Sequence, residues 1–93
     1  MICRIFDIQG GIELYDEVIK RLGEEEKPEG VHAHIAGKTD GGFQVIEVWD
    51  SIDHSDRHMS QGTGQAIEEV MQAAGASAPA VTDLEVHEMK WLG

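Results

Sequence analysis

Hydrophobic and polar residues recur at regular spacings in the first part of the chain, and the spacings predict its elements. Residues 2–8 are rich in Ile and Phe and stop at two glycines, which is typical of a strand. Residues 14–22 place apolar side chains at helical period with charged residues between them, and Gly23 supplies a stop signal. The chain is therefore predicted to begin with a strand and an amphipathic helix.

A hairpin is predicted in the middle of the chain. Residues 31–37 and 43–50 are both strand candidates, and the segment between them contains Asp40 followed by Gly41. An Asp-Gly pair is a strong signal for a tight turn between antiparallel strands. We therefore expect the two strands to pair directly.

A second helical region and a last strand complete the pattern. Ser51 suits the cap of a helix that runs towards residue 74, and Gly62 and Gly64 are expected to split that helix. Residues 84–91 alternate in the manner of a strand. The order β-α-β-β-α-β is the ferredoxin-like arrangement, so the predicted fold class is α+β with a four-stranded antiparallel sheet.

The hairpin sorts its side chains into two sets, and neither is plainly polar. One set is apolar and comprises Val31, Ala33, Ile35, Ile46 and Val48. The other set is mixed and comprises His32, His34, Phe43, Val45, Glu47 and Trp49. Helices cover only one face of such a sheet, so the second face must be wet or covered by a partner. We expect two copies to pack face to face as a homodimer in the form of an α/β barrel.

Length and composition limit the possible classes of protein. The chain has 93 residues, for which we expect one domain spanning residues 1–93, and 41% of them are hydrophobic, as in ordinary globular proteins. We expect neither a membrane span nor a signal peptide, because no long apolar run is present. Cys3 is the only cysteine, which excludes an intramolecular disulfide and favours a cytoplasmic setting.

Acidic residues far outnumber basic ones. The chain has 18 Asp and Glu against 7 Lys and Arg, which gives a formal net charge of -11. Residues 24–30 hold four of the glutamates and are predicted to form an exposed loop. The summed field repels polyanions, so we expect no nucleic-acid partner and no anionic membrane partner.

The register of the hairpin brings candidate chemistry to one face. Pairing outward from a two-residue turn places His34 opposite Glu47 and His32 opposite Trp49, and Phe43 shares their face. A carboxylate beside an imidazole fixes its tautomer and strengthens it as a base, so His34 and Glu47 are candidate catalytic residues. His32, Trp49 and Phe43 are candidate ligand-binding residues. The alternative is that the His34–Glu47 pair is a structural hydrogen bond.

Two more histidines are predicted to share one face of the second helical region. His54 and His58 are four residues apart, a spacing that can hold a divalent metal. A closed zinc site normally supplies three or four protein ligands, and only nearby aspartates could complete this one. We therefore predict a pair that lines a pocket without a metal, with His54 binding ligand and His58 facing Trp49.

Residues 34–51 resemble the central segment of small dimeric α/β-barrel proteins of the antibiotic biosynthesis monooxygenase-like superfamily. The resemblance is carried by a histidine on a strand, a Gly-rich hairpin and the run Glu-Val-Trp-Asp-Ser at residues 47–51. Residues 64–67 also resemble a Gly-Pro-Ala-Leu step of that group. The resemblance implies a ligand cavity between sheet and helices, with His58, nine residues after Trp49, in its wall.

Two functions remain open at this point. The resemblance implies a cofactor-independent enzyme of the monooxygenase, isomerase or cyclase type, in which a small aromatic or polyketide-like molecule lies against Trp49. In that case His34, with Glu47 and His58, would move a proton. The alternative is a non-catalytic or haem-binding dimer with the same pocket, in which a histidine serves as the ligand.

Overall fold

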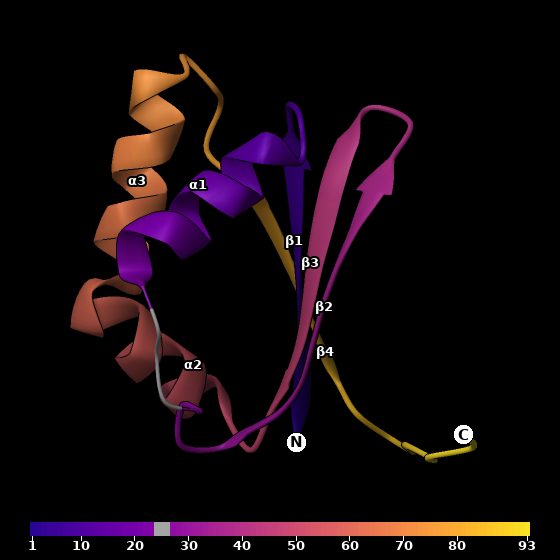
Figure 1. Ribbon diagram of the computed structural model, residues 1–93. Helices are drawn as coiled ribbons and strands as arrows, with labels where there is room; N and C mark the ends of the chain where they lie inside the picture. The colour runs from indigo at the N-terminus through magenta and orange to yellow at the C-terminus, as the bar shows by residue number, and fades with distance from the viewer. Residues whose placement is uncertain (24–26) are drawn as a thin grey trace.

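The computed structural model describes residues 1–23 and 27–93, so residues 24–26 of the predicted acidic loop lie outside the described residues. The described elements follow one another as β-α-β-β-α-β, which confirms the predicted ferredoxin-like order (Figure 1). In chain order they are β1 (Ile2–Gln9), α1 (Glu13–Leu22), β2 (Val31–Thr39), β3 (Gly42–Trp49), α2 (Ile52–His58), a π-helical turn (Met59–Thr63), α3 (Gly64–Ala73) and β4 (Ala80–Glu85).

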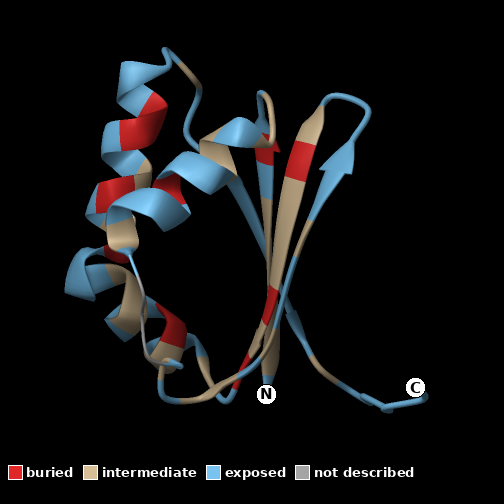
Figure 2. Cartoon of the chain, in the orientation of Figure 1, coloured by how far each residue is buried: buried red, intermediate tan, exposed pale blue. Residues whose placement is uncertain are grey.

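The four strands form one antiparallel sheet in the order β2-β3-β1-β4. All the helices lie on one side of this sheet, and most buried residues lie between the two layers (Figures 1 and 2). The core has two clusters, one of Ile8, Phe43 and Met71, the other of Val18, Ala66 and Val70. None of the described helices is both long and apolar enough to cross a membrane.

The mixed set of hairpin side chains, apart from His32, faces the helices. Phe43, Glu47 and Trp49 are almost fully buried, with exposed fractions of 3%, 6% and 1%. Four members of the apolar set lie on the opposite face, where no described helix covers them: Ala33, Ile35, Ile46 and Val48. Val31, which was predicted with them, instead lies on the helix side opposite Trp49, because a β-bulge shifts the register after it. Ile35 on the open face is 58% exposed. The helix-covered face therefore carries the candidate chemistry, and the open face is the apolar one.

The second helical region breaks where the glycines predicted a break. Ser51 caps α2 by accepting a hydrogen bond from the His54 N–H at 3.3 Å. The π-helical turn that follows is interrupted at Gly62, whose φ of 115° lies in the left-handed region that favours glycine. The break separates α2 from α3, so each packs on the sheet at its own angle.

The last strand lies earlier in the sequence than its pattern predicts. The prediction of residues 84–91 is wrong, because β4 runs from Ala80 to Glu85 and pairs with β1 from Asp7 to Ile2. The Val86 N–H still donates to the Met1 carbonyl at 3.0 Å, but β1 offers no further partner. The residues after it project away from the sheet, and Trp91 is 94% exposed (Figure 1).

Arg4 joins β1 to both β4 and α2 through its guanidinium group. Its Nε and Nη2 donate to the carboxylate of Asp83 at 2.8 and 2.9 Å, and Nη1 donates to Asp56 and to the fully buried Ser55 hydroxyl. The hydrogen bond from Arg4 holds the pKa of Asp83 below its ordinary value. This network fixes the position of α2, and therefore of His58 at its end.

We expect Arg4→Met to lower the free energy of unfolding by about 1–3 kcal/mol at pH 7, because Ser55 and Asp83 lose a charged donor. Urea unfolding followed by circular dichroism measures the change, and Arg4→Lys, which keeps the charge, should lose less. The pKa of Asp83 is lower in the folded state than in the unfolded state. Its ion pair with Arg4 therefore contributes fully to the free energy of unfolding above roughly pH 4, and this contribution disappears as the pH falls through the lowered pKa. A difference between wild type and Arg4→Met that stays constant down to pH 2 would contradict this assignment.

Candidate functional site

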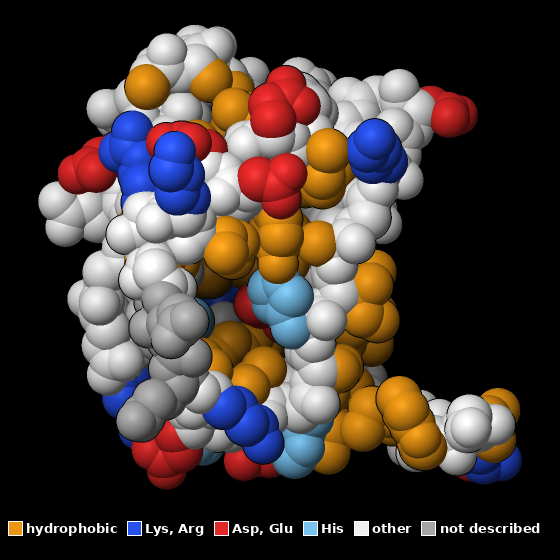
Figure 3. All heavy atoms as spheres, in the orientation of Figure 1, with side chains coloured by type: hydrophobic (Ala, Val, Ile, Leu, Met, Phe, Trp, Pro, Cys, Tyr) orange, Lys and Arg blue, Asp and Glu red, His pale blue; other side chains and the backbone are white. Residues whose placement is uncertain are grey.

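A cavity of about 390 Å³ lies between the helices and the sheet. Its walls are mainly aliphatic and aromatic, and the residues predicted for the site that line it are His34, Phe43, Glu47, Trp49 and His58. Figure 3 shows the hollow, with hydrophobic side chains inside it and a histidine at its rim. The cavity is large enough for a small organic ligand, for which protein pockets usually begin at about 300 Å³.

His34 and Glu47 form a hydrogen-bonded pair across β2 and β3. They are direct partners in the strand register, as predicted, and Nδ1 of His34 lies 2.8 Å from Oε2 of Glu47. The Glu47 side chain is only 8% exposed, whereas that of His34 is 41% exposed. A buried carboxylate thus supports an imidazole that remains accessible at the rim.

The hydrogen bonds assign the proton positions in this pair. Glu47 also accepts the indole N–H of Trp49 at 3.3 Å, and an indole can only donate. An ionised Glu47 offers acceptors only, so the Nδ1 of His34 that faces Oε2 carries the imidazole proton. The lone pair on Nε2 of His34 is left to accept a proton.

Tyr15 contacts that free nitrogen from the opposite layer. Its hydroxyl lies 2.8 Å from Nε2 of His34 and donates to it. Burial raises the pKa of Tyr15, and the charges of Glu47 and Asp16 raise it further, so the phenol keeps its proton near neutral pH. The result is a chain of hydrogen bonds from Tyr15 through His34 to Glu47.

Sequence reasoning missed Tyr15 as a site residue. It lies on the apolar stripe of α1, where its ring packs edge-on to Phe43 with ring centroids 6.5 Å apart. The only available signal was a hydroxyl on a stripe that faces a strand bearing histidines. Such a signal does not say which histidine the hydroxyl meets, because that depends on how α1 crosses the sheet.

His58 lies against Trp49 deeper in the same cavity. Their ring centroids are 5.5 Å apart and the planes are inclined by 37°, which agrees with the expected facing of these residues. Nε2 of His58 is 3.3 Å from the hydroxyl of Thr63, five residues further on. His58 and Thr63 lie at the two ends of the π-helical turn, in which the Gly64 N–H donates to the Met59 carbonyl five residues earlier.

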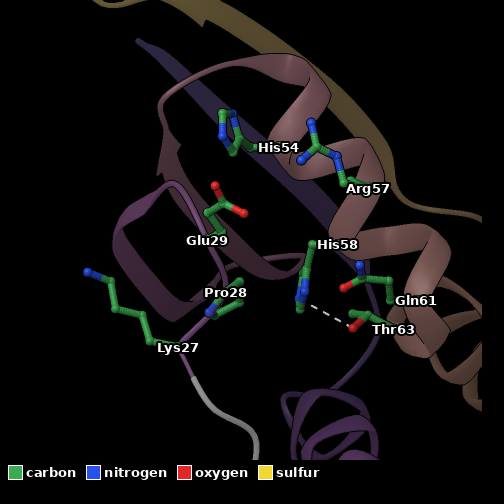
Figure 4. Close-up of a pocket in the computed structure, with 8 residues that line it drawn as sticks. All are labelled: Lys27, Pro28, Glu29, His54, Arg57, His58, Gln61 and Thr63. Atoms are coloured by element: carbon green, nitrogen blue, oxygen red, sulfur yellow. Dashed lines mark hydrogen bonds between the residues drawn. The ribbon is translucent and has the colours of Figure 1, made fainter.

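A second, more polar cavity of about 280 Å³ adjoins the first. Figure 4 shows its lining, which includes His54, Arg57 and His58 from α2 and Lys27 and Glu29 from the segment before β2. His54 packs against this segment at Gly30, where an added Cβ would lie 2.5 Å from the imidazole ring. The position therefore requires glycine, and its φ of 86° adds to that requirement.

The predicted position of His32 is wrong. A β-bulge between Val31 and Ala33 interrupts the ladder, so Val31 rather than His32 opposes Trp49. His32 is turned to the edge of the sheet, where its Nε2 pairs with the carboxylate of Asp50. His32 lines neither cavity, and the ligand-binding role predicted for it gains no support.

The histidines of α2 do not form a cluster with other ligating side chains. In the described ranges 1–23 and 27–93, no group of three or more His, Cys, Asp or Glu residues is placed to hold a metal ion. His54 instead bonds to Ser51 through Nδ1 at 2.7 Å, and His58 contacts Thr63. The two residues line the polar cavity together, as the helical spacing predicted.

Comparison with known proteins identifies the fold. Neither protein-family models nor curated proteins give a match to the sequence. A solved structure from Deinococcus radiodurans, provisionally assigned as an antibiotic biosynthesis monooxygenase, is similar over 100% of both chains, with 17% identity and a TM-score of 0.75. SnoaB, a cofactor-independent oxygenase from Streptomyces nogalater, matches 95% of this chain and 92% of its own, with 16% identity and a TM-score of 0.61.

A third similar structure holds a porphyrin. It is a variant of MhuD with two manganese protoporphyrin IX molecules bound per active site, and it is 16% identical over 100% of both chains with a TM-score of 0.56. The three proteins define the class to which this architecture corresponds, the antibiotic biosynthesis monooxygenase-like fold. The chain has that fold, as the resemblance of residues 34–51 implied. At these identities the likeness concerns the fold and not the activity.

The proton positions can be tested with Glu47→Gln. An amide oxygen can accept from Trp49 or from His34, but the amide nitrogen then faces the other donor. We expect His34 to shift towards the tautomer with its proton on Nε2, and the free energy of unfolding to fall by about 1–3 kcal/mol. Long-range ¹H–¹⁵N spectra of the imidazole nitrogens report the tautomer directly.

Asp50→Asn is the matched control for that measurement, because Asp50 pairs with His32 at the edge of the sheet. It should alter the signals of His32 and leave those of His34 unchanged. Spectra of His34 that are identical in wild type and Glu47→Gln would show that Glu47 does not hold its proton.

Proposed function

We propose that this protein binds a small aromatic molecule in the apolar cavity and transfers a proton from it to His34. The observation that carries the proposal is the half-exposed imidazole of His34, whose Nδ1 is held by the buried carboxylate of Glu47 and whose Nε2 accepts from the Tyr15 hydroxyl. A base of this kind beside an apolar wall suits substrates with an acidic C–H or O–H group. Phe43 and Trp49 supply aromatic surface for the body of the substrate.

The proton would move along hydrogen bonds that are already formed. The substrate gives its proton to Nε2 of His34, either directly or through the Tyr15 hydroxyl, which passes its own proton on as it takes up the new one. Glu47 then faces an imidazolium and stabilises its charge across the 2.8 Å contact. The substrate anion is left in a cavity with apolar walls, ready for the next step.

Proton abstraction without a cofactor is the step shared by the oxygenase, isomerase and cyclase activities that the sequence resemblance implies. The fold of SnoaB, described as a cofactor-independent oxygenase, supports this choice. We place His58 in a supporting role, because it lies in the cavity beside Trp49 but contacts Thr63 rather than a carboxylate. His54 is assigned to ligand binding in the polar cavity.

The arrangement of the histidines does not fit a haem ligand. Only His34 and His58 line the large cavity among the described histidines, and each has its Nε2 in a hydrogen bond, with Tyr15 and Thr63 respectively. Nδ1 of His34 is held by Glu47. Ligation of haem iron through either Nε2 would require its hydrogen bond to break, so we derive no step through haem.

We expect the protein to catalyse hydrogen–deuterium exchange at the acidic carbon of 2-tetralone, a bicyclic ketone that tests proton abstraction alone. His34→Gln should lower the exchange rate by about 10² or more, the usual contribution of a positioned base. Tyr15→Phe should lower it less, since His34 can still act directly. Proton NMR in D₂O measures the rate.

His32→Gln serves as the control for this exchange, because His32 is also a histidine of β2 but lines neither cavity. It should exchange at the rate of the wild-type protein. If His34→Gln also matches the wild type, His34 is not the base and the proposed function is wrong.

We also propose that two copies associate through the open face of the sheet. That face exposes Ile35 and Leu84 at 58% and 46%, and it continues over the apolar residues Cys3, Ile5, Ile46 and Val48. The segment after β4 leaves the sheet on this side and exposes Trp91 (Figure 1). Contiguous apolar surface of this kind favours a second copy as the cover.

Sedimentation should give a mass of about twice the 10.2 kDa of one chain at micromolar concentration. Ile35→Glu should shift the protein to the monomer, because it would bury a charge in the interface. Ile19→Glu is the matched control, since Ile19 is 45% exposed but lies on α1. A wild-type protein that sediments only as a monomer would exclude this association.

A further inference from the structure

We propose that the ligand of this pocket carries a carboxylate, which binds in the polar cavity between Arg57, Lys27 and His54. The inference rests on the proposed function, because this subsite is the outer end of the same pocket. It adds the chemical class of the ligand, an arylalkanoate with an aromatic body in the apolar cavity and an acidic end at the mouth.

The two cavities adjoin and share part of their walls. Lys27, Pro28, His58 and Thr63 line both of them. His58 therefore stands at the junction, with its ring against Trp49 on the apolar side and with Arg57 and His54 beside it in the polar cavity (Figure 4). A molecule that fills the apolar cavity and extends past His58 would place its end group among these cationic and imidazole side chains.

Positive charge is scarce in this protein, and a large share of it lies at this mouth. The chain has 7 Lys and Arg for a formal charge of -11. Arg4 and Arg21 are bound to carboxylates, and Lys90 pairs with Glu88. Within residues 1–23 and 27–93, Lys27 and Arg57 form no ion pair, so their charges are available to a ligand.

The acidic groups near the cavity set the charge that the ligand can carry. Glu29 lines the same cavity, so two formal positive charges face one negative charge there. Lys27, Glu29 and Arg57 are all exposed, so solvent weakens all three charges. Three glutamates also precede Lys27 in the sequence. A single carboxylate suits this balance better than a dianion.

The donors at the mouth are of the kinds that bind a carboxylate. The guanidinium of Arg57 can give two parallel hydrogen bonds to a planar carboxylate, which an amide cannot accept in the same way. Nδ1 of His54 lies 2.7 Å from the Ser51 hydroxyl. When that hydroxyl donates to Nδ1, the proton of the imidazole is on Nε2, which then acts as a donor.

The test compares two ligands that share their aromatic body and differ in the end group, 2-naphthylacetate and the uncharged 2-naphthylacetamide, by isothermal titration calorimetry. Wild-type protein should bind the acetate at least about tenfold more tightly than the amide, as expected for one charge-assisted pair of hydrogen bonds. Arg57→Gln should weaken binding of the acetate about tenfold and leave that of the amide unchanged. The preference should also decrease as salt is added.

Lys20→Gln is the matched control, since it removes the same charge from α1 and lines neither cavity. It should leave both affinities unchanged. If wild type and Arg57→Gln each bind the two ligands with equal affinity, the proposed carboxylate subsite is wrong, and binding in the apolar cavity remains supported. If neither ligand binds, the apolar cavity does not bind aromatic molecules of this kind. In that case the proposed function is wrong together with this inference.

Discussion

The buried carboxylate of Glu47 is the constraint on which the site depends. A charge placed between a sheet and its helices is costly unless hydrogen-bond donors face it, and here His34 and Trp49 each donate to one oxygen of the carboxylate. Because both residues must point at Glu47, their side-chain orientations are fixed, and the rim and the wall of the cavity are fixed with them. Tyr15 then completes the arrangement from α1. The stability of this part of the fold and the geometry of the candidate site thus have one origin.

The fold was largely predictable because its signals are local. The alternation of the hairpin, the Asp-Gly turn and the stripe on α1 each lie within a few residues, and together they give the element order and the His34–Glu47 pairing. Tyr15 and Arg4 could not be found in this way, since their partners are distant in the sequence. The end of β4 was misplaced for a similar reason, because alternation continues after the partner strand has ended.

The two ends of the pocket depend on different forces. The inner part is shaped by apolar packing of Phe43 and Trp49 against the helices, which depends little on salt or pH. The outer part depends on α2, which is held by its Ser51 cap and by the Arg4 network. A change that loosens α2 would therefore affect the mouth of the pocket before it affects the apolar cavity.

The bulge in β2 has a consequence for any comparison with related chains. At the bulge, β2 has one residue more than β3. Val31 pairs with Trp49 and Ala33 pairs with Val48, so His32 between them has no partner in β3. A related chain without the bulge would have one residue fewer at this point of β2. Its counterpart of His34, the residue that pairs with the counterpart of Glu47, would therefore follow the preceding loop by one residue less. Histidines of such chains would then appear misaligned in sequence although they occupy the same place in space. Equivalence in this fold is better judged by the partner across the sheet than by distance along the chain.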